Sequence, residues 1–231
     1  MLLLAFETSA KAASVALFEG EKLLGEQYQN TGLTHSQTLL LMAESLLSQC
    51  GKTPQEVQAV AVANGPGSFT GVRIGVATAK GFAWGGEIPI YGVSTLEAMA
   101  RGLGIWDGYV CPVMDARRAQ VYNALFYVNQ GAFARVTPDR AIALSELETE
   151  LKTLEKPIFL VGDGSNLCYN TLSQTVPKLV LPPESKLHQR AVGVGLAALQ
   201  QKAPDAPEAL APEYLRLSQA ERERNEKMNN R

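Results

Sequence analysis

The stretch Ala59–Gly75 has the sequence AVAVANGPGSFTGVRIG, and it predicts a strand, a glycine-rich loop and a helix in direct succession. The apolar run over residues 59–63 is typical of a strand that is buried on both faces. A helix is expected from about Gly71 to Trp84. Backbone N–H groups at the start of a helix attract anions, so this loop is a generic candidate for binding phosphate.

Two phosphate-binding motifs can be tested against this loop. A Walker A loop requires a lysine after its last glycine, but Val72 follows Gly71. A dinucleotide-binding loop requires an acidic residue about 20 positions further on. Ile90–Val93 occupies that place and carries no acidic residue. The remaining alternative is that the glycines only permit a tight turn and close packing.

The same order of elements is predicted twice along the chain. Three extended segments come first, and a helix, a strand, a helix, a strand and a helix follow. In the first half these are residues 2–8, 12–18, 22–29, 36–49, 59–63, 71–84, 88–93 and about 95–104. In the second half they are residues 109–115, 120–128, 131–143, 145–155, 157–161, 165–174, 178–181 and 187–202.

This order predicts an α/β fold. Strands joined by tight turns pair antiparallel, whereas strands that alternate with helices join a sheet in parallel. Two similar subdomains, each a mixed sheet covered by helices, resemble the actin-like ATPase (ASKHA) architecture. We place the boundary at Trp106–Gly108, with subdomains over residues 1–106 and 107–231. The second would include a proline-rich connector at 203–212 and a charged tail at 218–231.

Composition and charge exclude several classes of protein. Lys and Arg number 21, Asp and Glu 23, and the net charge of -2 argues against a protein that binds nucleic acid alone through a basic surface. The three cysteines are widely spaced, so neither a disulfide framework nor a zinc site is expected. No apolar run approaches the roughly 18 residues of a membrane span. The opening Met1–Phe6 lacks the basic flank of a secretion signal, so we expect a cytoplasmic protein without membrane contact.

Two predicted helices carry surplus apolar surface. In the helix over residues 71–84, small residues recur every four positions, at Gly71, Gly75, Ala79 and Ala83. Such a stripe allows close approach of another element. The leucines of the helix over 36–49 cover more than one narrow face. Periodicity alone leaves open whether these faces belong to the core or contact a partner protein.

Five blocks of the sequence resemble the TsaB (YeaZ) family of tRNA threonylcarbamoyladenosine biosynthesis subunits. The most specific is Gly65–Gly75, with the sequence GPGSFTGVRIG. The others are Leu3–Ser9, Gly92–Leu96, Met114–Arg118 followed by Gln120–Tyr122, and Pro212–Arg216. The resemblance extends from residue 3 to about residue 216.

The resemblance implies an accessory, non-catalytic subunit with the actin-like ATPase fold. Such a subunit is required when a TsaD-like catalytic subunit transfers threonylcarbamoyl from threonylcarbamoyl-AMP to tRNA. The acceptor is the adenosine beside the anticodon in tRNAs that read codons beginning with A. A TsaE-like ATPase docks on the pair, tRNA binds through the complex, and the subunit alone forms a homodimer. The complex uses ATP, and this chain itself requires no cofactor.

The resemblance also implies where the partner binds. In the family, the first two helices pack against the equivalent helices of the TsaD-like subunit. Carried over to this sequence, the partner-binding residues lie in the helices over 36–49 and 71–84. They are Leu39, Met42, Ala43, Leu46, Gly71, Ile74, Gly75, Thr78, Ala79 and Phe82.

Catalytic residues and metal ligands are not expected. Catalytic relatives hold a metal with two histidines spaced His-x-x-x-His, but Leu39 stands four residues after His35. His35 is interpreted as a residue that packs at a helix start. The turn Glu7–Ser9 lacks the glycine of a phosphate-binding turn. In the turn Asp115–Arg117, larger residues stand where small ones would let the backbone approach a phosphate.

The cleft is therefore predicted to be degenerate. Gly65, Gly67, Asp115, Gly162 and Gly164 are the candidates for residual nucleotide binding. The alternative is an active kinase or phosphotransferase of the same superfamily. Arg73, Arg117 and Arg118 are further candidates, for tRNA contacts within the complex.

Overall fold

The first three strands form the predicted antiparallel meander. A computed structural model describes residues 1–105 and 107–216, so Trp106 and the charged tail at 218–231 lie outside the described residues. Two later strands join the meander in parallel, and the sheet order is β3-β2-β1-β4-β5. The strands are β1 (Leu2–Glu7), β2 (Ala13–Glu19), β3 (Lys22–Gln29), β4 (Ala59–Gly65) and β5 (Ile90–Ser94).

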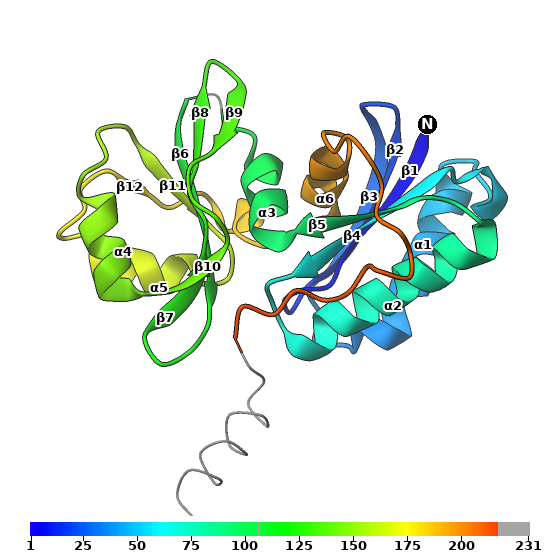
Figure 1. The fold of residues 1–231 in the computed structure, drawn as a ribbon, viewed down its shortest axis with the longest axis horizontal. Coiled ribbons are helices and arrows are strands. Elements are labelled where there is room, and N and C mark those ends of the chain that lie inside the picture. Colours follow the sequence, from blue (N-terminus) through cyan, green and yellow to red (C-terminus); the bar gives the residue numbers. More distant parts are fainter. Residues whose placement is uncertain (106, 217–231) are drawn as a thin grey trace, which may run out of the picture.

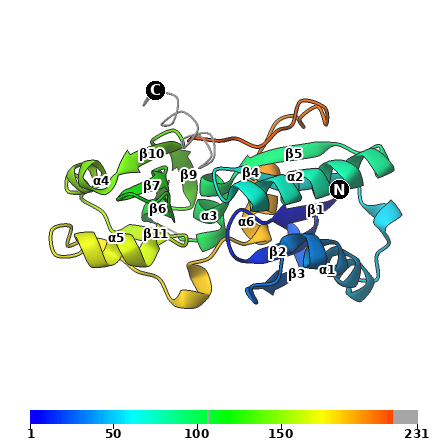
Figure 2. The ribbon, with the colours of Figure 1, turned by 90° about the horizontal axis from the view of Figure 1, so that it is seen from below.

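Two helices lie side by side on one face of this sheet (Figure 1, Figure 2). They are α1 (His35–Gln49) and α2 (Phe69–Gly86). The helix α2 begins two residues before the predicted start because the Ser68 hydroxyl accepts a hydrogen bond from the Gly71 N–H, at 3.3 Å. Between α1 and β4, the one-turn helix η1 (Pro54–Glu56) has a capping box, with the Thr53 N–H donating to Glu56 at 2.8 Å.

The second sheet repeats the topology of the first. Its order is β10-β7-β6-β11-β12, and off this path β8 pairs with β6 and β9 pairs with β8. The strands are β6 (Gly108–Asp115), β7 (Gln120–Asn123), β8 (Phe126–Asn129), β9 (Ala132–Arg135), β10 (Arg140–Ala143), β11 (Ile158–Val161) and β12 (Leu179–Val180). The helical elements are α4 (Leu144–Leu151), α5 (Ser165–Leu172) and the short η2 (Glu184–Lys186).

Two segments predicted as continuous strands are each interrupted. The segment 120–128 divides into β7 and β8 opposite Pro112, which has no N–H to donate to the ladder. The register nevertheless continues across the break, since Val113 faces Asn123 and Val110 faces Phe126. The segment 131–143 divides into β9 and β10 at a bulge, where the N–H groups of residues 136 and 137 both donate to the Leu125 carbonyl.

Each half of the chain contributes one helix that packs against the sheet of the other half. The helix α3 (Thr95–Leu103) follows the first sheet, but its Leu96 and Met99 pack against Val110 and Phe126 of the second. The helix α6 (Ala191–Ala198) follows the second sheet but packs on β1 and β2, where Gly195 lies against the Phe18 ring. It is shorter than the predicted 187–202. The two halves are therefore not self-contained along the sequence.

The proline-rich segment after α6 also returns to the first half. Residues 203–216, drawn in orange to red in Figure 1, run along β5 and α2. The Asp205 N–H donates to the Ile90 carbonyl at 2.8 Å, and the Glu213 N–H donates to the Asn64 carbonyl at 2.7 Å. Leu210 is buried in the core beneath α2. We call residues 203–216 the C-terminal strap.

None of the helices among the described residues has the length and apolar character that a membrane-spanning helix needs.

Candidate functional site

The two turns predicted to be degenerate phosphate-binding turns lie at the carboxyl ends of the inner strands. Glu7 ends β1 and Asp115 ends β6, while Asp163 follows β11. The three carboxylates interact electrostatically, because Asp163 acts on both Glu7 and Asp115. The two halves therefore place these three acidic side chains near one another where the two sheets meet.

The first turn is closed by its own carboxylate. The Ser9 N–H donates to Glu7 Oε1 at 2.6 Å, and the Ser9 carbonyl accepts from the Ser68 N–H at 2.7 Å. The Thr8 hydroxyl donates to the Gly71 carbonyl at 2.8 Å. An amide that is bonded to a carboxylate is not available to a phosphate, and the carboxylate repels one.

The second turn has the same construction. The Arg117 N–H donates to Asp115 Oδ1 at 2.7 Å. Behind it, the Gly164 N–H donates to the Val113 carbonyl at 3.1 Å. A side chain at Gly162 would overlap the same carbonyl, so this glycine serves the close approach of β6.

The glycines predicted to bind nucleotide contact this chain itself. A Cβ atom on Gly65 would overlap the Glu213 carbonyl of the strap, and one on Gly67 would lie 2.5 Å from the Ser9 carbonyl. Gly164 packs on the backbone around Asp115. The structure therefore supports the packing interpretation of these glycines. A cavity of about 230 Å³ between α3, η2 and β3 is lined by none of the five nucleotide candidates.

Glu7 is the most perturbed carboxyl group of the cleft. Its side chain is fully buried, and its Oε2 has no hydrogen-bond partner. Burial raises the pKa of Glu7 from 4.5 to about 7, and the hydrogen bonds from Ser9 oppose that rise. The folded state therefore holds the proton of Glu7 more tightly than the unfolded state does.

Glu7→Gln is expected to stabilise the chain at pH 8 and not at pH 4. As the pH rises from 4.5 to 7, the unfolded state releases a proton that the folded state retains, so stability falls through this window. The shift corresponds to about 3 kcal/mol above pH 7, at about 1.4 kcal/mol per pKa unit. Glutamine keeps the acceptor for Ser9 and carries no charge. Urea unfolding at both pH values measures the difference, with Glu44→Gln on the exposed face of α1 as the control.

The structure orients the predicted partner-binding residues. Of the ten, Leu39, Met42, Ala43, Leu46, Gly71, Gly75 and Ala79 are buried within this chain, and Ile74, Thr78 and Phe82 are half-buried. The small stripe of α2 faces inward, because Gly71 and Gly75 pack against Thr8. Seven of the ten residues therefore present no outer surface that a partner could contact, and the other three are partly exposed.

The exposed apolar residues of α1 and α2 are not among these ten. Leu40 and Leu41 on α1 are 52% and 65% exposed, and Trp84 on α2 is 60% exposed. Leu33, just before α1, is 58% exposed. The signal was present in the run Leu39–Met42, because four consecutive apolar residues on a helix cannot all face one side. We call Leu33, Leu40, Leu41 and Trp84 the α1–α2 surface.

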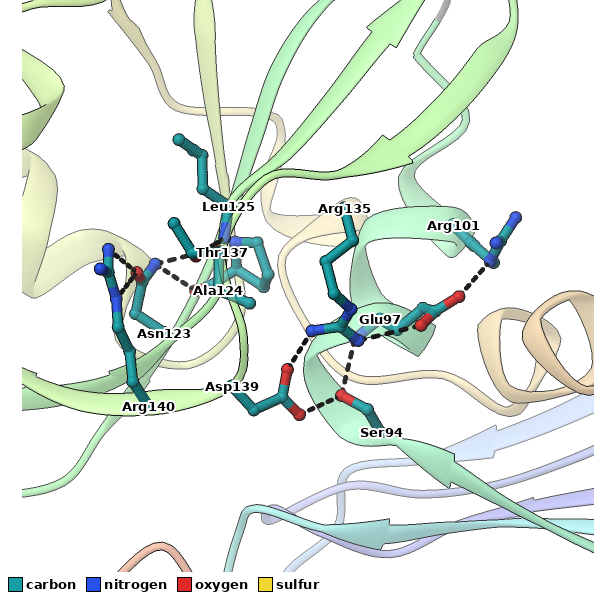
Figure 3. Close-up of polar contacts among 11 residues, drawn as sticks. Ser94, Glu97, Arg101, Asn123, Ala124, Leu125, Arg135, Thr137, Asp139 and Arg140 are labelled. Carbon is teal, nitrogen blue, oxygen red and sulfur yellow. Dashed lines mark hydrogen bonds and ion pairs between the residues drawn. The ribbon is translucent and has the colours of Figure 1, made fainter.

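A polar network joins the first half to the outer strands of the second (Figure 3). Arg135 pairs with Asp139 and, at 2.9 Å, with Glu97 of α3, which also pairs with Arg101. The Ser94 hydroxyl, at the end of β5, donates to Asp139. Elsewhere at the junction, Arg190 before α6 pairs with Glu26 of β3 at 2.5 Å. Ion pairs at both places join residues of the first half to residues of the second.

His35 packs at the start of α1, as predicted, with its Nε2 2.8 Å from the Ala10 carbonyl oxygen. Over residues 1–105 and 107–216, no group of three or more His, Cys, Asp or Glu side chains is arranged to hold a metal ion.

Comparison with known proteins gives consistent matches over most of the chain. The family model described as TsaD, tRNA N6-adenosine threonylcarbamoyltransferase, matches residues 29–224. The tRNA threonylcarbamoyladenosine biosynthesis protein TsaB of Bacillus subtilis (strain 168) is 33% identical over 222 residues, which cover 96% of each chain.

Solved structures agree with the sequence matches. YeaZ from Pseudomonas aeruginosa superposes with a TM-score of 0.73 at 26% identity, covering 93% of this chain and 99% of that chain. Component A of the (R)-2-hydroxyglutaryl-CoA dehydratase of Acidaminococcus fermentans has a TM-score of 0.52 at 11% identity, covering 87% and 98%. This second likeness concerns the fold alone, and it confirms the predicted actin-like ATPase fold.

Proposed function

Because the chain belongs to the TsaB (YeaZ) family and takes part in the biosynthesis of threonylcarbamoyladenosine in tRNA, we propose that it is the accessory, non-catalytic subunit of the transferase. It binds and activates a TsaD-like subunit, which transfers threonylcarbamoyl to the adenosine beside the anticodon. A TsaE-like ATPase and tRNA join the complex, and the chain alone forms a homodimer. We propose that the complex acts in the cytoplasm.

The observation that carries the non-catalytic role is the occupation of both phosphate turns. The Ser9 and Arg117 amides already bond to the carboxylates of Glu7 and Asp115. A kinase of this fold needs such amides for the phosphates of its nucleotide. The proposal therefore assigns ATP use to the other subunits of the complex.

Partner binding is proposed to use the α1–α2 surface. Single exposed apolar residues are ordinary, but here Leu40, Leu41 and Trp84 lie on two neighbouring helices that otherwise bury their apolar side chains. A large exposed aromatic residue such as Trp84 is typical of the centre of a protein–protein interface. The proposed partner-binding helices are still α1 and α2, as the family resemblance implies. The partner would contact their exposed outer faces rather than their buried ones.

The purified chain is expected to show no ATP turnover above background. The measurement is steady-state phosphate release, with Asp115→Ala as the paired variant. Steady turnover that disappears in Asp115→Ala would favour the alternative, an active phosphotransferase of the same superfamily.

Light scattering tests the subunit role directly. The chain should have the mass of a homodimer when alone and form a mixed complex with the TsaD-like protein from the same source. A chain that keeps its own mass in the mixture would contradict the accessory role and leave the fold unaffected.

A further inference from the structure

Four arginines follow one path along the cleft. Arg73, on α2, donates from Nε to the Tyr214 hydroxyl of the strap at 2.7 Å. Arg216, two residues after Tyr214, donates from Nη1 to the Ala116 carbonyl at 2.6 Å. Arg117 and Arg118 follow Ala116 directly in the turn between β6 and β7. We call Arg73, Arg117, Arg118 and Arg216 the arginine arc, which runs from the first half to the second.

The arc begins on an aromatic pair. The rings of Phe69 and Tyr214 stack with centroids 4.2 Å apart and planes 8° apart. The Arg73 guanidinium lies 5.7 and 5.6 Å from the two ring centroids. Tyr214 remains 39% exposed. Exposed aromatic rings beside guanidinium groups are what unpaired bases and phosphates bind in RNA-binding proteins.

The arc ends on a strained turn. Arg117, Arg118 and Ala119 have φ values of 63°, 54° and 55°, in the left-handed region. Residues other than glycine rarely adopt this conformation, and those that do cluster at functional sites. The Ala116 N–H to Gln120 carbonyl bond, at 3.0 Å, and the Leu144 N–H to Ala119 carbonyl bond, at 3.1 Å, hold the turn. The strain sets two arginines side by side on the outside of the protein, where both are exposed.

Two acidic residues, Asp115 and Glu213, lie beside the four arginines in the sequence. One oxygen of Asp115 accepts a hydrogen bond from the Arg117 N–H. The arc also lies near the start of α2, where the helix dipole adds positive potential.

We propose that the arginine arc binds the sugar–phosphate backbone of the tRNA within the complex. The proposal rests on the proposed function, which brings tRNA to this chain. Guanidinium groups match phosphate oxygens in a two-pronged geometry, and the exposed Tyr214 offers a surface on which an unpaired base can stack. An RNA is favoured over an acidic protein because the aromatic face has no use in an ion-pairing surface.

The test is tRNA binding by the assembled complex over a range of salt concentrations. Arg117→Ala/Arg118→Ala should weaken tRNA binding at least tenfold near physiological salt. It should also reduce the slope of log K against log salt by about 1 to 2, because each lost phosphate contact removes close to one unit. The matched control is Lys22→Ala/Lys178→Ala, which removes two exposed charges at the opposite ends of the strands and should leave affinity and slope unchanged.

Light scattering separates the two proposals. The double arginine variant should assemble with the TsaD-like subunit as the parent chain does. An assembled variant with unchanged tRNA affinity and slope would overturn the arc and leave the accessory role standing. Loss of assembly would overturn the proposal that the arc binds tRNA and would favour an acidic protein partner. A parent chain that never assembles would instead contradict the proposed function.

Discussion

Gly71→Ala is expected to lower the free energy of unfolding by about 2–4 kcal/mol. Alanine is the better helix former by about 1 kcal/mol, so helix propensity alone predicts a gain. The structure reverses the sign, because the new methyl group would overlap the Thr8 carbonyl oxygen. That oxygen belongs to a buried turn at the end of β1 and has no room to retreat. Urea unfolding followed by circular dichroism measures the change.

The same substitution at Gly81 is the matched control. Gly81 lies on the same helix, is exposed, and would place its methyl group where no atom lies within 4 Å. Gly81→Ala should stabilise the chain by about 0.5–1 kcal/mol. Equal effects at the two positions would mean that the stripe does not pack on Thr8. By the same argument, Gly75→Leu and Ala79→Arg should prevent folding rather than only partner binding.

Leu41→Glu/Trp84→Glu is expected to weaken binding of the TsaD-like subunit at least 30-fold. Charged groups in the centre of an apolar interface lose hydration without gaining partners, and two such anchors together cost about 2 kcal/mol or more. Both side chains are more than half exposed, so the free energy of unfolding should change by less than about 0.5 kcal/mol. Titration of the TsaD-like protein measures the affinity.

Leu167→Glu provides the control for this surface. Leu167 is 40% exposed on α5, in the second half, and its replacement makes a similar change of character away from α1 and α2. It should leave the affinity unchanged. If both variants bind as tightly as the parent chain, the partner surface lies elsewhere. If the double variant unfolds, Leu41 and Trp84 support the fold and are not simply surface residues.

Much of the fold could be predicted because its signals are local. Tight turns between the first three strands imply antiparallel pairing, and the capping box at Thr53 predicts η1 from four residues. The interruptions of the strands over 120–128 and 131–143 were not predictable in the same way. They depend on Pro112 in a neighbouring strand and on two N–H groups converging on the Leu125 carbonyl.

The sequence places the candidate turns at the ends of strands, but the use of their glycines was not predictable. A glycine that admits phosphate and a glycine that admits a carbonyl oxygen look alike in sequence. The oxygen that fills the space at Gly71 comes from Thr8, 63 residues earlier. The one at Gly65 comes from Glu213, at the far end of the chain.

The sequence by itself determined the family, the doubled order of elements and the two helices with surplus apolar surface. These follow from residue types at short, fixed spacings, which local backbone geometry translates directly into strands, turns and helices. Only the tertiary structure decided which face of each helix is outside, that α3 and α6 pack on the opposite sheets, and that the strap brings Arg73 and Arg117 into one arc. Those outcomes depend on contacts between residues far apart in the chain, and burial there is settled by which surfaces meet rather than by the pattern of any one segment.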